Sequence, residues 1–382
     1  MASASNTNIT SPFENAKYEL VKLEKICEMY QPKTITSAEI LDEGDYKVYG
    51  ANGVIGYYNK YNHEFEEVAL TCRGATCGTV NLTEPKSWIT GNAMIVSPLN
   101  DSKVLKKFLF YVLPLADMKL VITGSAQPQI TRTNLSQLKI PLPPLNIQQQ
   151  IVEECQNVEN QILNIQQQIQ TQKTLINAVL AKCEIISAEF QNNENLQNLD
   201  LPDLPEPKNF GLISWKNVKI SNQLEALDFE SIKISKDKYE SNGKYPIISQ
   251  ESNELISGYT NLENPINENL PLIIFGDHTC VFKFVDFPFF RGADGTQILK
   301  FNKEFNMKFA FYVLKTIKIT NQDKYERHFK YLKEMQIPLP PIEAQEKIVQ
   351  AINNIEQNIN NLQTNLENLK LQQNQILQKY LF

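Results

Sequence analysis

The sequence lacks the features that mark membrane-spanning, secreted or disulfide-stabilised proteins. Its six cysteines are scattered and show no paired spacing, which favours free thiols in a reducing compartment. Cys72 and Cys77 have the wrong spacing for a zinc site, and only three histidines are present to complete one. No apolar run is long enough to span a bilayer, and residues 1–10 lack the apolar stretch of a secretory signal. These absences predict a cytoplasmic protein.

Catalytic motifs are also missing. The sequence has no glycine-rich phosphate loop and no Gly-x-Ser-x-Gly nucleophile motif. A nucleic-acid amino-methyltransferase needs an Asn/Asp-Pro-Pro-aromatic loop to hold the target amine, and none is present. The carboxylates near Pro202 lie in a proline-rich linker, where the rigid geometry of a nuclease site is not expected. We therefore expect no catalytic residue, metal site or cofactor site in this chain.

Acidic residues outnumber basic ones, which does not suit an independent DNA-binding protein. The formal net charge is −6. Residues 1–145 carry 14 basic and 14 acidic groups, and residues 209–341 carry 17 and 16. A protein that binds DNA tightly by itself usually shows a basic footprint. The composition still allows a component whose partners supply the phosphate contacts.

The chain contains two copies of one pattern. The pentapeptide Ile-Pro-Leu-Pro-Pro occupies residues 140–144 and returns at 337–341. Residues 107–113 and 308–314 share an aromatic-rich pattern, and the offset between matching positions drifts only from 197 to 203. A repeat of this length is a duplicated domain rather than a solenoid unit. Two similar domains suggest a protein that reads two related targets at a fixed separation.

Each copy begins with a body that mixes strand and helix signals. Strand-like runs at 67–72 and 270–275 are bounded by many glycine and asparagine turn residues. Residues 105–113 and 305–314 each predict one short helix that is apolar on one face. We therefore expect an α+β fold for both bodies. The predicted divisions are a first domain at 1–145, a long helix at 146–186, a linker at 187–212, a second domain at 213–341 and a second long helix at 342–382.

A long helical pattern follows each Pro-Pro pair. Apolar positions recur in alternating steps of four and three from 151 to 183 and again from 348 to 380. Such narrow seams are typical of helices that pair in a coiled coil. The alternative is two amphipathic helices packed on separate cores, but each seam is narrow for that role. Gln172 and Gln373 each interrupt a seam and are candidates for setting its register.

Two segments carry side chains suited to nucleic-acid contact. Residues 324–331 interleave cations with aromatic rings, which can contact phosphates, base edges and sugars. The equivalent segment at 124–132 is rich in amides, and glutamine can pair with adenine through two hydrogen bonds. For residues 324–331 the alternative is a helix start whose aromatics face the core. For residues 124–132 the alternative is a purely structural turn. The candidate contact residues are Tyr57, Lys60, Arg73, Gln127, Gln129, Thr131, Arg132, His278, Arg291, Lys324, Tyr325, Arg327, His328 and Lys330.

An ordered set of phrases resembles the specificity (S) subunits of type I restriction–modification systems. The set covers nearly the whole chain, which makes it specific although each phrase alone is weak. The phrases are Tyr-Gly-Ala-Asn-Gly-Val-Ile-Gly-Tyr at 49–57, the turn at 73–78, Gly-Ser-Ala-Gln-Pro-Gln-Ile-Thr at 124–131, and both Ile-Pro-Leu-Pro-Pro helix starts followed by Gln148 and Gln345. The second copy departs from the first, because Asn321 and Gln322 replace Gly124 and Ser125 and no glycine follows Cys280.

The resemblance implies a fold of two target-recognition domains separated by an antiparallel coiled coil of two long helices. Each domain would read one half of a bipartite, asymmetric site in double-stranded DNA, and the coiled coil would set the spacer. Two methylating (M) subunits, which bind S-adenosylmethionine and methylate adenine N6, would dock on this scaffold, optionally with two restriction (R) subunits. The alternatives are an enzyme with an unrecognised site and a structural coiled-coil adaptor that does not contact DNA.

Overall fold

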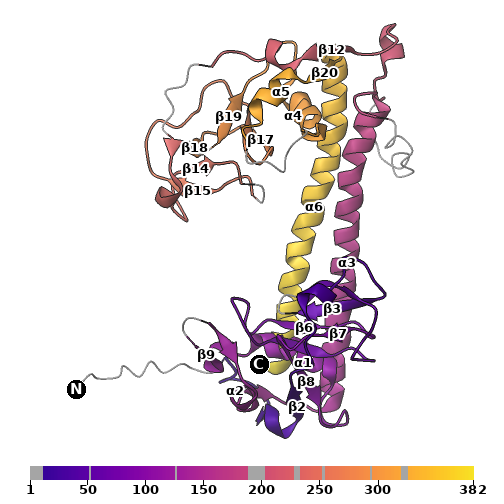
Figure 1. The fold of residues 1–382 in the computed structure, drawn as a ribbon, viewed down its shortest axis with the longest axis vertical. Coiled ribbons are helices and arrows are strands. Elements are labelled where there is room, and N and C mark those ends of the chain that lie inside the picture. The colour runs from indigo at the N-terminus through magenta and orange to yellow at the C-terminus, as the bar shows by residue number, and fades with distance from the viewer. Residues whose placement is uncertain are drawn as a thin grey trace, which may run out of the picture. The chain divides into compact units, whose positions relative to one another are not determined.

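The chain is described here by a computed structural model of residues 12–50, 53–124, 127–187, 203–227, 233–251, 254–292, 295–319 and 326–382. It divides into two compact units, Met1–Gln166 with Thr364–Phe382 and Gln167–Gln363. Each unit holds one α+β body and one half of each long helix, α3 (Leu145–Lys182) and α6 (Ile342–Leu381) (Figure 1). Within the described ranges, no helix is long and apolar enough to cross a membrane.

The first body contains two main sheets and two short helices. One sheet has the order β2-β8-β5-β6 and the other has the order β4-β3-β7. Valine, leucine and methionine side chains of the first sheet pack against α1 and the start of α3 in one buried cluster. The elements are β1 (Leu20–Lys22), β2 (Cys27–Tyr30), β3 (Tyr46–Gly50), β4 (Gly53–Tyr58), β5 (Val68–Thr71), β6 (Val80–Leu82), β7 (Trp88–Ile89), β8 (Ala93–Pro98), α1 (Lys106–Val112), β9 (Ile122–Thr123), β10 (Gln129–Ile130), α2 (Arg132–Ser136) and β11 (Lys139–Pro141).

The second body repeats this plan with changes at its edges. A three-stranded sheet of order β17-β16-β19 takes the place of the first sheet, and a sheet of order β13-β18-β14-β15 takes the place of the second. The elements are β12 (Lys216–Lys219), β13 (Lys233–Ile234), β14 (Tyr245–Ile248), β15 (Gly258–Thr260), β16 (Leu272–Gly276), β17 (Phe282–Val285), β18 (Phe290–Gly292), β19 (Thr296–Leu299), α4 (Met307–Thr316), α5 (Phe329–Glu334) and β20 (Gln336–Leu339). The prediction of two similar α+β bodies is confirmed.

The two Ile-Pro-Leu-Pro-Pro phrases form the same transition from strand to helix. In the first unit β11 pairs antiparallel with β1, and in the second β20 pairs antiparallel with β12. The Pro-Pro pair then ends the strand, and α3 begins at Leu145 as α6 begins at Ile342. Proline suits this place because it fits the first turn of a helix but not its interior. The predicted helix starts are confirmed, and the domain boundaries based on them stay predictions.

One buried glutamine fastens each long helix to its body. The Gln148 side chain accepts a hydrogen bond from the Leu105 amide at 2.9 Å and donates to the Lys103 and Pro143 carbonyls at 3.0 and 2.8 Å. Gln345 makes the same three bonds, each at 2.8 Å, to the backbone of Asn306, Glu304 and Pro340. Both side chains have no exposed surface. We call each set of three bonds a glutamine bridge.

Replacement of Gln148 by leucine should destabilise the first body by about 2–4 kcal/mol, because it leaves buried backbone groups without partners. The Gln345→Leu variant should do the same to the second body. Thermal unfolding of each variant measures the effect. Gln149→Leu is the matched control, since Gln149 is the exposed neighbour on the same helix. Equal loss of stability in the Gln148 and Gln149 variants would contradict a role for the glutamine bridge.

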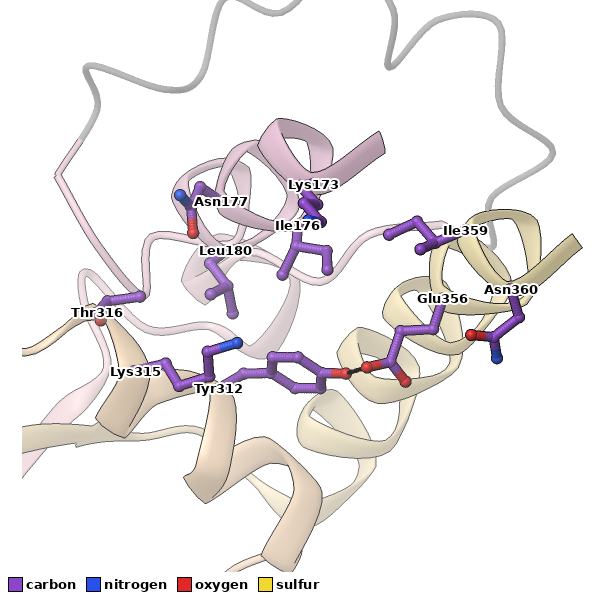
Figure 2. Close-up of a pocket in the computed structure, with 10 residues that line it drawn as sticks. All are labelled: Lys173, Ile176, Asn177, Leu180, Tyr312, Lys315, Thr316, Glu356, Ile359 and Asn360. Atoms are coloured by element: carbon purple, nitrogen blue, oxygen red, sulfur yellow. Dashed lines mark hydrogen bonds between the residues drawn. The ribbon is translucent and has the colours of Figure 1, made fainter. Parts of the chain in front are cut away.

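A tyrosine and a glutamate make a second repeated link between body and long helix. The Tyr111 hydroxyl of α1 donates to the Glu159 carboxylate of α3 at 2.7 Å. In the second unit Tyr312 of α4 donates in the same way to Glu356 of α6 (Figure 2). Burial first, and the neighbouring carboxylate second, raise the pKa of both tyrosines, so each hydroxyl keeps its proton and remains a donor. Each short helix is therefore fixed in rotation against its long helix.

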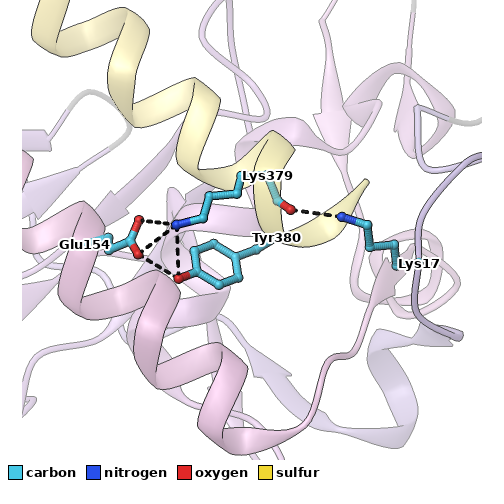
Figure 3. A network of polar contacts seen from close by, with 4 residues as sticks. All are labelled: Lys17, Glu154, Lys379 and Tyr380. Carbon is cyan, nitrogen blue, oxygen red and sulfur yellow. Dashed lines mark hydrogen bonds and ion pairs between the residues drawn. The ribbon is translucent and has the colours of Figure 1, made fainter.

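The predicted seams are the buried faces of the long helices. All ten seam positions on each helix are buried or half-buried, whereas Leu163 and Leu371 outside the seams are 57% and 60% exposed. In the first unit Glu154 pairs with Lys379 at 3.1 Å (Figure 3). Nearby, Glu159 accepts from Gln373 at 3.2 Å. Residue numbers rise along α3 while they fall along α6, so the helices run antiparallel. Pairing is confirmed, and separate packing of the two helices is wrong.

The two seam glutamines do not behave alike. Gln373 donates to Glu159 of the other helix. The Gln172 side-chain oxygen is buried and has no hydrogen-bond partner among the described residues. A role for these residues in setting register stays a prediction, and only Gln373 has a polar contact that supports it.

The C-terminal end of each long helix is covered by the segment that leads into a body. In the first unit the Lys17 ammonium donates to the Lys379 carbonyl at 2.9 Å (Figure 3). The Lys17 amide donates to the Leu381 carbonyl at 2.8 Å. In the second unit the Trp215 indole donates to the Cys183 carbonyl at the end of α3 at 2.6 Å. The last carbonyls of a helix have no partners within the helix, so these contacts satisfy some of them.

Candidate nucleic-acid interface

In the first body, the amide-rich segment is held on the end of strand β5. The Ile130 amide donates to the Cys72 carbonyl at 3.0 Å, and the Gly74 amide donates to the Pro128 carbonyl at 3.1 Å. Arg73 and Gln129 form an isolated β-bridge between these two segments. The backbone bonds therefore place the candidate residues Arg73 and Gln129 side by side.

These residues surround an open pocket of about 560 Å³. It is lined by Arg73, Gly74, Asn92, Gln127, Pro128 and Gln129. The side chains of Arg73, Asn92, Gln127 and Gln129 are all exposed. Gly74 has a φ of 89°, which favours glycine in the turn that presents Arg73. The pocket thus offers one guanidinium and several amides to a ligand.

The other candidates of the first body lie outside this pocket. Thr131 caps α2, because its hydroxyl accepts from the Asn134 amide at 3.2 Å, and the exposed Arg132 is the first residue of that helix. Tyr57 is half-buried on β4, where its backbone pairs with Leu41. Lys60 is exposed just after β4. The structure therefore brings together Arg73, Gln127 and Gln129. It places Tyr57 on the other sheet and Lys60 just after the last residue of β4.

In the second body, the equivalent segment is held on the end of β16 by Asp277. The Asp277 carbonyl accepts from the His328 amide at 2.9 Å. Its carboxylate accepts from the Phe329 amide at 2.7 Å and from the Gln297 amide group at 3.2 Å. Asp277 is only 2% exposed. A carboxylate at the first turn of α5 also interacts favourably with the amides exposed there.

His278 and Arg291 lie near this anchor and are partly committed to the backbone. The His278 Nδ1 lies 3.1 Å from the Glu326 carbonyl, and the His278 amide donates to the Gln250 side chain at 3.3 Å. The Arg291 guanidinium donates to the Thr296 carbonyl at 3.0 Å. Burial lowers the pKa of Arg291, and its Nε has no hydrogen-bond partner among the described residues. Both side chains are half-buried rather than free at the surface.

The segment before α5 divides into exposed and buried candidates. Arg327 and Lys330 are exposed, and Lys330 lies 3.6 Å from Glu326 and above the Tyr331 ring at 4.7 Å. His328 is fully buried, and neither ring nitrogen has a hydrogen-bond partner among the described residues. Its ring does not reach solvent in this conformation. Lys324 and Tyr325, with Asn321 and Gln322, lie outside the described residues.

Three polar residues of these regions were missed from the sequence. Asn92 lines the first pocket, but its Gly-Asn context indicates only a turn. Asp277 and Gln297 form the anchor of the second body, although they are 20 positions apart in sequence. No spacing motif joins them, because strand pairing between β16 and β19 brings them together.

The described cysteines and possible metal ligands do not meet the needs of thiol or metal chemistry. Burial raises the pKa of Cys27, Cys155 and Cys183 to about 12, so these thiols stay protonated. All six cysteines are free. The described residues contain no cluster of histidine, cysteine and carboxylate side chains that could hold a metal ion.

Comparison with known proteins identifies a repeated domain. The family model of the type I restriction modification DNA specificity domain matches residues 15–173 and 213–371. A Mycoplasma pneumoniae protein named as a type I specificity subunit is 22% identical over 341 residues, which are 87% of this chain and 87% of that protein. Another from the same organism is 29% identical over 144 residues, 36% of this chain and 47% of that relative. The match to the EcoprrI specificity subunit of Escherichia coli is 25% over 130 residues, 33% of this chain and 32% of the subunit.

These last two matches span about half or less of the relatives' own lengths. The fold is similar to the crystal structure of the S subunit of a type I restriction-modification system from M. genitalium. That similarity has a TM-score of 0.59 at 17% identity and covers 98% of this chain and 99% of the other. The fold class expected from the sequence, two α+β bodies with an antiparallel pair of long helices, is confirmed.

Proposed function

Because the chain belongs to the family of type I restriction–modification DNA specificity proteins, we propose that it recognises the DNA sequence for such a complex. The observation that carries this proposal is the repeated anchor with unequal side chains. Both bodies hold one segment on the end of a central strand, at Cys72–Gly74 and at Asp277. The first presents Arg73 and amides, and the second presents Arg327 and Lys330. A constant frame with different polar groups suits two different half-sites.

The two bodies and the two long helices have separate roles in the proposed recognition of DNA. Each body reads one half of an asymmetric site in double-stranded DNA, and the paired helices α3 and α6 set the spacer between the halves. The glutamine bridges and the Tyr–Glu links support this role, because they fix each body to its helices without a flexible joint. A structural adaptor without DNA contact would not need exposed guanidinium and amide groups around a pocket.

The partners are DNA and the other subunits of the system. Two methylating subunits dock on the helix pair, optionally joined by two restriction subunits, and the assembly works in the cytoplasm. The methylating subunits bind S-adenosylmethionine and transfer its methyl group to adenine N6. This chain supplies recognition and no catalytic group. The search for catalytic motifs in the sequence supports this division of labour.

The proposed function is tested by methylation mapping. The chain and its methylating subunits are produced together in a host without other adenine methylases, and methylated adenines are located across the genome. We expect one bipartite motif with a fixed spacer. Methylation that requires this chain but follows no sequence motif would support the adaptor alternative, and methylation by the purified chain alone would support an enzyme.

The Asp277→Ala variant should damage the reading of one half-site only. It removes the acceptor of the Phe329 amide, while the backbone bond from the His328 amide remains. The segment at 326–328 is then held less firmly, at a cost of about 1–3 kcal/mol. The measurement is competition binding by the complex with each half-site scrambled in turn. The variant should discriminate less well at one half-site and as well as the wild type at the other, because distant sites act additively. Asp286→Ala is the control, because Asp286 is exposed in the same body. Equal loss in both halves would argue against separate reading bodies.

A further inference from the structure

Arginine is rare in this chain, and its positions are informative. The sequence contains four arginines among 37 basic residues, at positions 73, 132, 291 and 327. Arg73 and Arg132 flank the anchored segment of the first body, and Arg291 and Arg327 lie near the equivalent segment of the second. Everywhere else the chain uses lysine.

The arginines are not retained for ion pairs. Every ion pair found between described residues has lysine as its cation, including the pairs that join body to helix and helix to helix. Lysine is therefore sufficient for the ion pairs between the described residues of this protein. Arginine differs from lysine in its planar fork of five donors, which matches paired acceptors. The need for that fork explains arginine better than the need for charge.

Arg73 is the arginine whose surroundings are best suited to contact with a base. It is exposed, and in the described structure it makes no ion pair. Its backbone is fixed by the bridge to Gln129 and by the turn at Gly74. It lines the pocket of about 560 Å³ together with Asn92 and Gln127. The side chain is thus free while its point of attachment is rigid, which limits the entropy lost on binding.

We propose that Arg73 distinguishes guanine in the half-site read by the first body, through paired hydrogen bonds to O6 and N7. This inference rests on the proposed function. The fork of arginine matches the two acceptors on the major-groove edge of guanine, and the amides of the same pocket match adenine. A phosphate contact carries no sequence information, so its loss weakens methylation equally on all sequences. The predicted signature of base reading is therefore a loss of discrimination that is confined to one base pair.

The test compares three variants in the complex with methylating subunits: Arg73→Lys, Arg73→Gln and the control Lys25→Gln. Lys25 is an exposed lysine of the same body and makes no ion pair in the described structure. Methylation rates are measured on duplexes in which each base pair of both half-sites is changed singly. We expect Arg73→Lys to reduce discrimination at one G·C pair of one half-site by about 5- to 150-fold. All other positions should keep their preferences, and Lys25→Gln should match the wild type.

Three results would overturn the inference. One is full discrimination by Arg73→Lys at every position. Another is a loss of methylation by Arg73→Gln that is equal on all sequences and that does not occur in Arg73→Lys. That pattern would identify a phosphate contact. The third is a loss confined to the half-site that Asp277→Ala affects. If the wild-type complex methylates without sequence preference, the proposed function itself fails, a result visible before any variant is made. Thermal unfolding of both Arg73 variants within about 2 °C of the wild type would show that the body is intact.

Discussion

The isolated chain should bind DNA weakly, with a Kd of about 10⁻⁶ M or above at physiological salt, and the complex should bind its site with a Kd of about 10⁻⁸ M or below. The physical reason is charge. The two bodies carry nearly equal numbers of acidic and basic groups, so few counterions are released when they approach a duplex. In the proposed complex, the methylating subunits supply the missing phosphate contacts around the DNA.

Fluorescence anisotropy with a labelled duplex, measured from 50 to 300 mM salt, tests this expectation. The chain alone should show a shallow dependence of log K on log salt, and the complex a steep one, because the slope counts the phosphates that are neutralised. A duplex with both half-sites scrambled is the control. Nanomolar, sequence-specific binding by the chain alone would contradict the view that it is a scaffold for recognition.

Shortening both long helices by one heptad should shorten the preferred spacer by about three base pairs. Deletion of residues 164–170 and 361–367 removes seven residues from each helix, about 10 Å at 1.5 Å per residue, and 10 Å is about three base pairs at 3.4 Å each. Both deletions keep the seam pattern in register. They also spare Glu159 and Glu356, which link the helices to Tyr111 and Tyr312.

The deletion should also weaken binding. Three base pairs turn the duplex by roughly 100°, since B-DNA has about 10.5 base pairs per turn, whereas a heptad deletion turns a straight helix by only about 20°. Bending of the DNA must absorb the difference and costs free energy. The measurement is methylation of a library with varied spacers by the reconstituted complex. A variant that duplicates the same two heptads should prefer a longer spacer. An unchanged preference in an active deletion variant would exclude the helices as the ruler.

The features predicted well from the sequence are those set by periodicity or by proline. The seams at 151–183 and 348–380 follow from apolar spacing alone, because a paired helix must bury one face along its whole length. The helix starts follow from the Pro-Pro pairs, because proline restricts the backbone wherever it occurs. Both signals are local, so they survive without knowledge of the tertiary structure.

The features predicted poorly are polar residues whose environment depends on distant segments. His328 lies in a run of cations and rings that indicates a surface, yet it is fully buried behind the start of α5. The alternative interpretation, a helix start whose aromatics face the core, describes it better. No sequence pattern marked Asp277 as an anchor, because its role depends on Gln297 and Phe329. These residues are distant in sequence and are brought to Asp277 by the tertiary structure. Such contacts are long-range, and one sequence does not encode them as a pattern.

The glutamine bridges have a consequence for how this protein can change over time. All six of their hydrogen bonds end on backbone amides or carbonyls of the body and the helix start. Backbone groups are the same whatever side chains surround them, so the glutamine bridge itself places few demands on the side chains of the body. Bodies of different sequence can therefore be joined to the same helix by the same bonds, provided that each keeps the tyrosine and the apolar side chains that also contact that helix.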